Sequence, residues 1–156
     1  MGQGTAMEIL LPPCVEAPPT PAPRPVAAPA VGTETVLLVE DEEGLQRLLQ
    51  TVLTRAGYRV LSAANGQQAL SLAEQEAGRI DLLVTDVIMP GMGGGDLADR
   101  LSTQRPDLKV LFISGYPDEA LGGAGPAGSE RGFLSKPFTA DELLQTVRDL
   151  LHRRAM

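Results

Sequence analysis

The sequence predicts an α/β fold in which one sheet of five parallel strands is covered by helices on both faces. From Thr35 onward, short apolar runs alternate with segments of helical periodicity. The apolar runs are continuous, which is typical of strands buried on both faces. Charged residues follow several of these runs directly, and open α/β sheets carry their chemistry at the carboxyl ends of the strands. We therefore expect a single doubly wound sheet with right-handed crossovers.

Each expected element has recognisable boundaries. The strands should cover residues 36–39, 58–63, 80–86, 109–113 and 132–135. The helices should cover residues 43–56, the interval between Gly66 and Gly78, residues 94–104, and a last segment that reaches His152. Gly57 ends the first helix, and Thr139 with Glu142 three residues later forms a capping box for the last one.

The segment between the fourth and fifth strands gives the weakest helical pattern. Residues 117–121 can begin a helix, but the glycine-rich residues 122–128 form a poor one. We expect this segment to be short or mobile.

The composition excludes several classes of function. The chain has 156 residues, and its 13 basic residues are scattered within a formal net charge of −7, which disfavours nucleic acid as a partner. Cys14 is the single cysteine, so neither a disulfide framework nor a cysteine-rich metal site is expected. No apolar run approaches the ~18 residues of a membrane span, and no secretory signal begins the chain. We therefore expect a cytoplasmic location without membrane contact.

Charged residues follow three of the expected strands. Glu40, Asp41 and Glu42 come after the first strand, Asp86 ends the third, and Lys136 follows the fifth. Because the carboxyl ends of parallel strands meet at one edge of the sheet, these side chains should converge. Clustered carboxylates repel one another unless a cation or a proton neutralises them. The sequence therefore predicts a metal and phosphoryl site at this edge.

Oxygen ligands of this kind suit Mg²⁺ or Mn²⁺. The expected direct ligands are Asp41, Asp86 and the backbone carbonyl of Ile88, and Glu40 is expected to contribute through water. The Asp86 carboxylate is the expected nucleophile, because a carboxylate can attack phosphorus and form an aspartyl phosphate.

Two further residues complete the predicted site. Lys136 should place a point-like positive charge on the other side of the phosphoryl group. Ser114, at the end of the fourth strand, offers a hydroxyl that can hydrogen-bond a phosphoryl oxygen. Pro137 is a candidate for a cis peptide bond, which would turn the chain where the lysine must point inward.

Four motifs occur in order at successive strand ends. They are Val-Glu-Asp-Glu at 39–42, Thr-Asp-Val-Ile-Met-Pro-Gly-Met at 85–92, Ile-Ser-Gly-Tyr at 113–116 and Lys-Pro-Phe at 136–138. On these motifs, residues 34–154 resemble the receiver domain of two-component response regulators. The resemblance implies a flavodoxin-like sheet of strand order 2-1-3-4-5. It also implies that Asp86 takes a phosphoryl group from the phosphohistidine of a histidine kinase, in cis or in trans, or exchanges it with a histidine phosphotransfer protein. The domain would catalyse its own phosphorylation and dephosphorylation.

The expected response to phosphorylation is a conformational switch. Phosphate on Asp86 would draw Ser114 towards it and let Phe133, which resembles the family's switch aromatic, rotate inward. This would remodel the face made by the fourth helix, the fifth strand and the fifth helix. The alternative function is a receiver-like module that binds partner proteins without being phosphorylated.

The first 33 residues differ in composition from the rest. Residues 12–29 are rich in Pro and Ala, as in an extended linker. Residues 2–12 resemble the closing glycine motif and last strand of a histidine-kinase ATPase domain. This implies the carboxyl-terminal receiver of a hybrid histidine kinase, tethered by the linker. Neither a kinase catalytic domain nor an effector domain is expected within these residues, so the output would be phosphotransfer, feedback on a kinase or a protein contact.

Other classes with chemistry at a strand end fit less well. A phosphatase of the haloacid-dehalogenase type needs a second acid two residues after its nucleophile, where this chain has Ile88. A flavodoxin-like flavin binder must receive a phosphate after the first strand, where residues 40–42 would repel it. A nucleotide-binding P-loop sequence does not occur.

Overall fold

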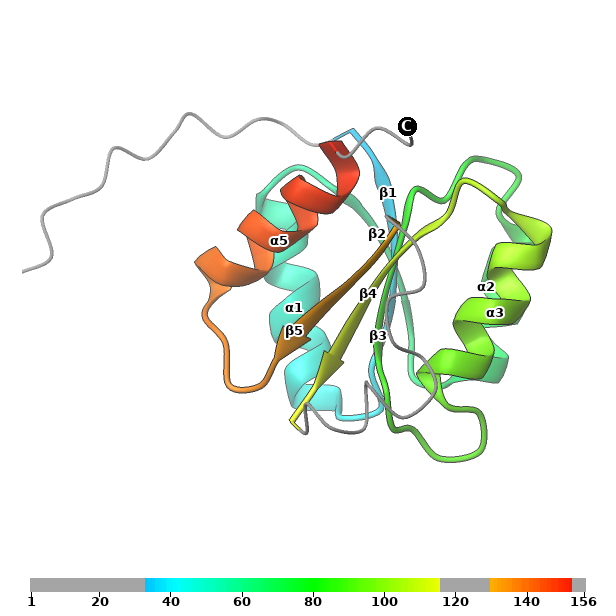
Figure 1. Ribbon diagram of the computed structural model, residues 1–156, viewed down its shortest axis with the longest axis horizontal. Coiled ribbons are helices and arrows are strands. Elements are labelled where there is room, and N and C mark those ends of the chain that lie inside the picture. Colours follow the sequence, from blue (N-terminus) through cyan, green and yellow to red (C-terminus); the bar gives the residue numbers. More distant parts are fainter. Residues whose placement is uncertain (1–32, 116–129, 153–156) are drawn as a thin grey trace, which may run out of the picture.

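The computed structural model describes residues 33–115 and 130–152. Within these ranges the chain forms one sheet of five parallel strands in the order β2-β1-β3-β4-β5 and four helices (Figure 1). In chain order the elements are β1 (Thr35–Val39), α1 (Glu43–Arg55), β2 (Arg59–Ala63), α2 (Gly66–Gln75), β3 (Leu82–Asp86), α3 (Gly94–Gln104), β4 (Lys109–Ser114), β5 (Arg131–Ser135) and α5 (Ala140–His152). The predicted fold class and strand order are confirmed. The Pro/Ala-rich segment and the expected helix after residue 117 lie outside the described residues.

The helices cover both faces of the sheet. Figure 1 shows α1 and α5 on one side of the strands and α2 and α3 on the other. In β1, Leu37 and Val39 belong to the core beneath α2 and α3, whereas Val36 and Leu38 belong to the core beneath α1 and α5. Alternate residues of one strand are therefore buried on opposite faces, which explains why the apolar runs are continuous.

The strand register brings the carboxyl ends of four strands to one edge. The ladder pairs Val39 with Thr85, Asp86 with Ile113, and Ser114 with Ser135. Glu40 follows β1 directly and Lys136 follows β5 directly, so both leave the sheet at the edge where Asp86 ends β3.

The last helix is fixed at both of its ends. At its start, the Thr139 N–H donates to Glu142 Oε2 at 2.7 Å and the Glu142 N–H donates to Thr139 Oγ1 at 3.2 Å, which confirms the predicted capping box. At its end, Lys109 Nζ donates to the carbonyl oxygens of Leu150 and Leu151, both at 2.8 Å. Lys109 begins β4, so this contact ties α5 to the amino end of the strand that carries Ser114.

Each strand differs from the sequence prediction at one end by one or two residues, and two of these differences concern Ser114 and Tyr58. Ser114 is the last residue of β4, one residue beyond the predicted end at Ile113, because the ladder continues through its pairing with Ser135. Its carbonyl also accepts from the Lys136 N–H at 2.8 Å. Tyr58 precedes β2 and is buried in the core beneath α1 and α5. None of the helices in the described ranges is both long and apolar enough to cross a membrane.

Candidate functional site

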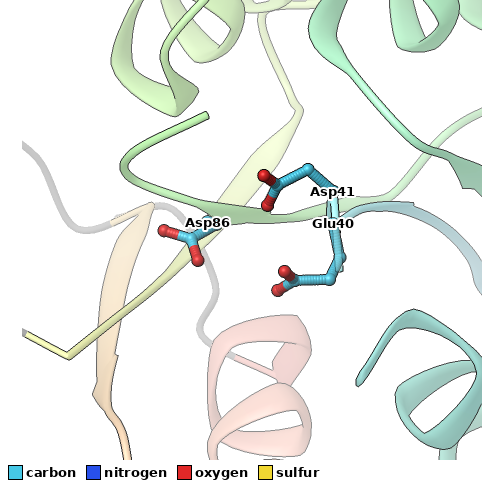
Figure 2. A group of neighbouring side chains, drawn as sticks. All are labelled: Glu40, Asp41 and Asp86. Atoms are coloured by element: carbon cyan, nitrogen blue, oxygen red, sulfur yellow. The ribbon is translucent and has the colours of Figure 1, made fainter. Parts of the chain in front are cut away.

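Three carboxylates meet at the carboxyl edge of the sheet. Glu40, Asp41 and Asp86 each have a carboxylate oxygen within 4.8 Å of the others (Figure 2). We call these three residues the acidic cluster. The sequence predicted that they converge, and the strand register described above is the reason that they do.

Glu40 is the buried member of the acidic cluster, with only 2% of its surface exposed. Its Oε1 accepts a hydrogen bond from the Glu42 N–H at 3.2 Å. Burial raises the pKa of Glu40 above its ordinary value, and the negative charge of Asp86 acts in the same direction, while the Glu42 amide and the Lys136 ammonium oppose the rise. Asp41, the next residue, is exposed. One acid therefore faces the protein interior and its neighbour faces solvent.

Asp86 has a separate partner for each carboxylate oxygen. Its Oδ1 accepts from the Ile88 N–H at 3.0 Å, and its Oδ2 accepts from Lys136 Nζ at 2.7 Å. The side chain is 14% exposed, so it is reachable from solvent but held in one orientation. The Ile88 side chain itself is exposed.

Lys136 is the cation of the site. Its Nζ lies 2.7 Å from Asp86 Oδ2 and 3.5 Å from Glu40 Oε2. Burial alone would lower the pKa of Lys136, but the hydrogen bond to Asp86 and the charges of Glu40 and Asp86 outweigh it and raise the pKa. The ammonium therefore stays charged beside the carboxylates. The peptide bond between Lys136 and Pro137 is cis.

The donor set fits a hard divalent cation. Three carboxylates offer only oxygen ligands, which Mg²⁺ and Mn²⁺ prefer, and one of them is exposed so that an ion can reach it. A groove of about 590 Å³ opens beside Asp41, between residues 64–67 and 90–92. The assignment of the Ile88 carbonyl and of a water-mediated role for Glu40 stay predictions.

Of the two expected switch residues, Ser114 lies at this edge and Phe133 lies in the middle of β5. Ser114 is 2% exposed at the end of β4. Phe133 lies in β5 beside Phe112 and packs, partly buried, against the core beneath α2 and α3. Their roles in a switch stay predictions, and Tyr116 of the third motif lies outside the described residues.

Sequence reasoning missed the close packing of Gly94 against Asp86. A Cβ at Gly94 would lie 2.1 Å from the Asp86 carbonyl oxygen and 3.0 Å from Thr85 Oγ1. The Thr85 hydroxyl, which is fully buried, donates to that same carbonyl at 3.0 Å. The only signal in the sequence was the glycine run at 93–95, which we interpreted as a helix start.

Sequence reasoning also missed Gln46. Its side-chain Nε2 donates to the Glu40 carbonyl oxygen at 3.1 Å and to the Ala63 carbonyl oxygen at 2.7 Å. A glutamine in an amphipathic helix carries no pattern that would reveal such a contact.

Comparison with known proteins agrees with this geometry. The response regulator receiver domain family matches residues 36–148 of the chain. The sensor kinase CckA of Brucella abortus (strain 2308) is 38% identical over 162 aligned residues, which cover 99% of this chain and 17% of the kinase. This chain therefore spans a small part of that relative.

Two solved structures are similar in fold. The crystal structure of the receiver domain from the hybrid histidine kinase CckA has a TM-score of 0.64 and 37% identity, and the match covers 76% of this chain and 99% of that one. The response regulator TrrA from Thermotoga maritima, solved in complex with Mg²⁺-BeF, has a TM-score of 0.67 and 29% identity over 76% of this chain and 99% of its own. With the family match, the strand order and the acidic cluster in agreement, the chain belongs to the response regulator receiver domain family of two-component systems.

Proposed function

We propose that Asp86 accepts a phosphoryl group from the phosphohistidine of a histidine kinase in a Mg²⁺-dependent reaction. The observation that carries the proposal is the position of the Lys136 ammonium, 2.7 Å from Asp86 within a group of three carboxylates. A cation poised beside a partly exposed carboxylate suits the transfer of an anionic group to that carboxylate. The similarity to TrrA, whose structure holds Mg²⁺-BeF, adds support.

The chain's own residues have distinct roles in this reaction. A carboxylate oxygen of Asp86 attacks phosphorus, the bond between phosphorus and the imidazole nitrogen breaks, and its electron pair stays on the imidazole. The Ile88 amide and the Lys136 ammonium orient the carboxylate before the donor arrives. Lys136 then offsets the charge of the phosphoryl oxygens, and the Ser114 hydroxyl donates to one of them.

A divalent ion would be held by Asp41, Asp86 and the Ile88 carbonyl, with Glu40 acting through water. When bound, Mg²⁺ or Mn²⁺ supplies positive charge that reduces the repulsion between the carboxylate and the incoming phosphoryl group.

The proposed consequence is a switch on the face made by the fourth helix, β5 and α5. Ser114 moves towards the phosphoryl group, and Phe133 rotates into the space that this movement opens. Phe133 is only partly buried where it packs against the core beneath α2 and α3, which supports a change in its burial as part of this switch.

We further propose that residues 34–154 form the cytoplasmic receiver of a hybrid histidine kinase, and that residues 1–33 form a Pro/Ala-rich linker that includes a remnant of the last strand of an ATPase domain. The alignment with CckA supports this because it covers 99% of the chain, and the amino-terminal segment is part of that span. A kinase in cis or in trans, or a histidine phosphotransfer protein, would be the partner.

Incubation with Mg²⁺ and acetyl phosphate tests the phosphoacceptor directly. Intact-protein mass spectrometry should show one added phosphoryl group, which hydroxylamine removes, in the wild type. Asp86→Asn should stay unmodified, whereas Asp107→Asn, an exposed acid in the turn before β4, should behave as the wild type. Equal labelling of Asp86→Asn would overturn the proposal. A wild-type protein with neither Mg²⁺ affinity nor an acylphosphate would instead support the phosphorylation-independent interaction module.

A further inference from the structure

Gln46 joins the ends of two neighbouring strands through its side chain. It lies in the second turn of α1, and its amide nitrogen donates to the carbonyl oxygens of Glu40 and Ala63, at 3.1 and 2.7 Å. Glu40 directly follows β1, and Ala63 is the last residue of β2. Both acceptors are carbonyls, so the two hydrogens of the amide are both used.

The segment that Gln46 holds carries two of the three clustered acids. Residues 40–42, which we call the acidic turn, lead the chain from β1 into α1. Other hydrogen bonds also hold this turn: the Glu40 N–H donates to Ala63 O at 3.2 Å, the Glu42 N–H donates to Glu40 Oε1 at 3.2 Å, and the Gln46 N–H donates to Glu42 O at 2.9 Å. Glu42 is the N-cap of α1 but makes no side-chain cap. The bond from Gln46 to Ala63 is therefore the shortest of the hydrogen bonds described at this turn.

We propose that Gln46 is a positioning residue for the acidic cluster. By fixing the acidic turn against the end of β2, it sets the spacing of Glu40 and Asp41 relative to Asp86. Its described hydrogen bonds go to main-chain carbonyls and not to the carboxylates, so it acts through the backbone. The inference rests on the proposed Mg²⁺-dependent function, because a cation held by several carboxylates is sensitive to their spacing.

Gln46→Met tests the proposal, because methionine keeps the length and neutrality of the side chain but has no donor. Gln50→Met is the matched control, since Gln50 is exposed one turn later on the same helix. Two quantities are measured on each folded variant: amide hydrogen exchange at Glu40 and Glu42 without metal, and Mg²⁺ affinity by calorimetry. In Gln46→Met, exchange at these amides should be about tenfold faster, the equivalent of one lost hydrogen bond. Mg²⁺ affinity should fall about tenfold, as for other residues that support metal ligands.

Gln50→Met should match the wild type in both measurements. Gln46→Ala provides a second variant if methionine disturbs the helix, since alanine favours helix formation. Wild-type exchange rates in both Gln46 variants, or faster exchange with unchanged Mg²⁺ affinity, would overturn the proposal. If the proposed Mg²⁺-dependent function is itself wrong, the result is different, because the wild-type protein would then bind no Mg²⁺.

Discussion

Replacing Gly94 with alanine should damage the proposed phosphoacceptor site without altering its charged groups. Gly94 begins α3, and a Cβ there would lie 2.1 Å from the Asp86 carbonyl oxygen. Because comfortable non-bonded contacts are ~3.5 Å, the helix start or the Asp86 peptide must move by more than about 1 Å. Asp86 ends β3 and pairs with Ile113, so this movement displaces the backbone that positions the proposed nucleophile.

The expected loss of stability and the expected loss of phosphorylation rate can both be given to an order of magnitude. Overpacking of this kind costs about 1–3 kcal/mol of the free energy of unfolding. A displacement of ~1 Å in the reacting group can lower a rate about 100-fold. We therefore expect Gly94→Ala to be folded but less stable in urea unfolding, and to be phosphorylated by acetyl phosphate about 100 times more slowly.

Gly44 provides the matched control. It lies in α1, and a Cβ there would have nothing within 4 Å. Gly44→Ala should therefore gain up to ~1 kcal/mol of stability from the higher helix propensity of alanine and keep the wild-type phosphorylation rate. Wild-type stability and rate in Gly94→Ala would refute the argument, because the space beside the Asp86 carbonyl would then not be restrictive.

Three further predictions concern the cation of the site and the two ends of α5. Lys136→Met removes the cation beside Glu40 and Asp86 and should slow phosphorylation by acetyl phosphate roughly 100-fold, which is the effect of losing one donor that stabilises developing charge in other enzymes. An unchanged rate would contradict the proposed role of Lys136. Hydrogen bonds from the Thr139 amide and hydroxyl lower the pKa of Glu142 in the folded protein below its ordinary value of 4.5. The stability that the ionised Glu142 contributes is therefore present above pH 4.5 and is lost as the pH falls through the lowered pKa of the folded state. Urea unfolding of Glu142→Gln should therefore show a deficit against the wild type at neutral pH that shrinks in acid; a deficit independent of pH would refute the linkage. Lys109→Met removes two hydrogen bonds to the last turn of α5 and should lower the free energy of unfolding by about 1–3 kcal/mol, with faster amide exchange at the end of that helix. Unchanged amide exchange there would show that these hydrogen bonds do not stabilise the helix end.

The sheet was predictable because each of its strands has the same local sequence pattern. In β1, residues buried on opposite faces follow one another, and this produces the unbroken apolar run that identified the strand. The charged residues of the site were found for the same reason: Glu40, Asp86 and Lys136 each end or follow a strand, and parallel strands bring such positions together.

The packing around the site was not predictable in the same way. Gly94 and Gln46 act through contacts with main-chain carbonyls that depend on how helices sit against strand ends. A carbonyl is present at every residue, so the sequence does not mark which one is approached. The fourth strand was predicted to end at Ile113 because Ser-Gly is a turn signal, whereas the pairing of Ser114 with Ser135 extends the strand by one residue.

The charge balance of the site links its geometry to the proposed chemistry. Three carboxylates beside one ammonium leave two negative charges when all the groups are ionised. Burial is the main cause of the raised pKa of Glu40, and the negative charge of Asp86 adds to the rise. The pKa of Lys136 is raised against the effect of burial by its hydrogen bond to Asp86 and by the charges of Glu40 and Asp86. A divalent cation would supply the two missing positive charges. A phosphoryl group that approached Asp86 would then meet a site close to neutral, so the number of acids at the strand ends supports the metal requirement that we propose.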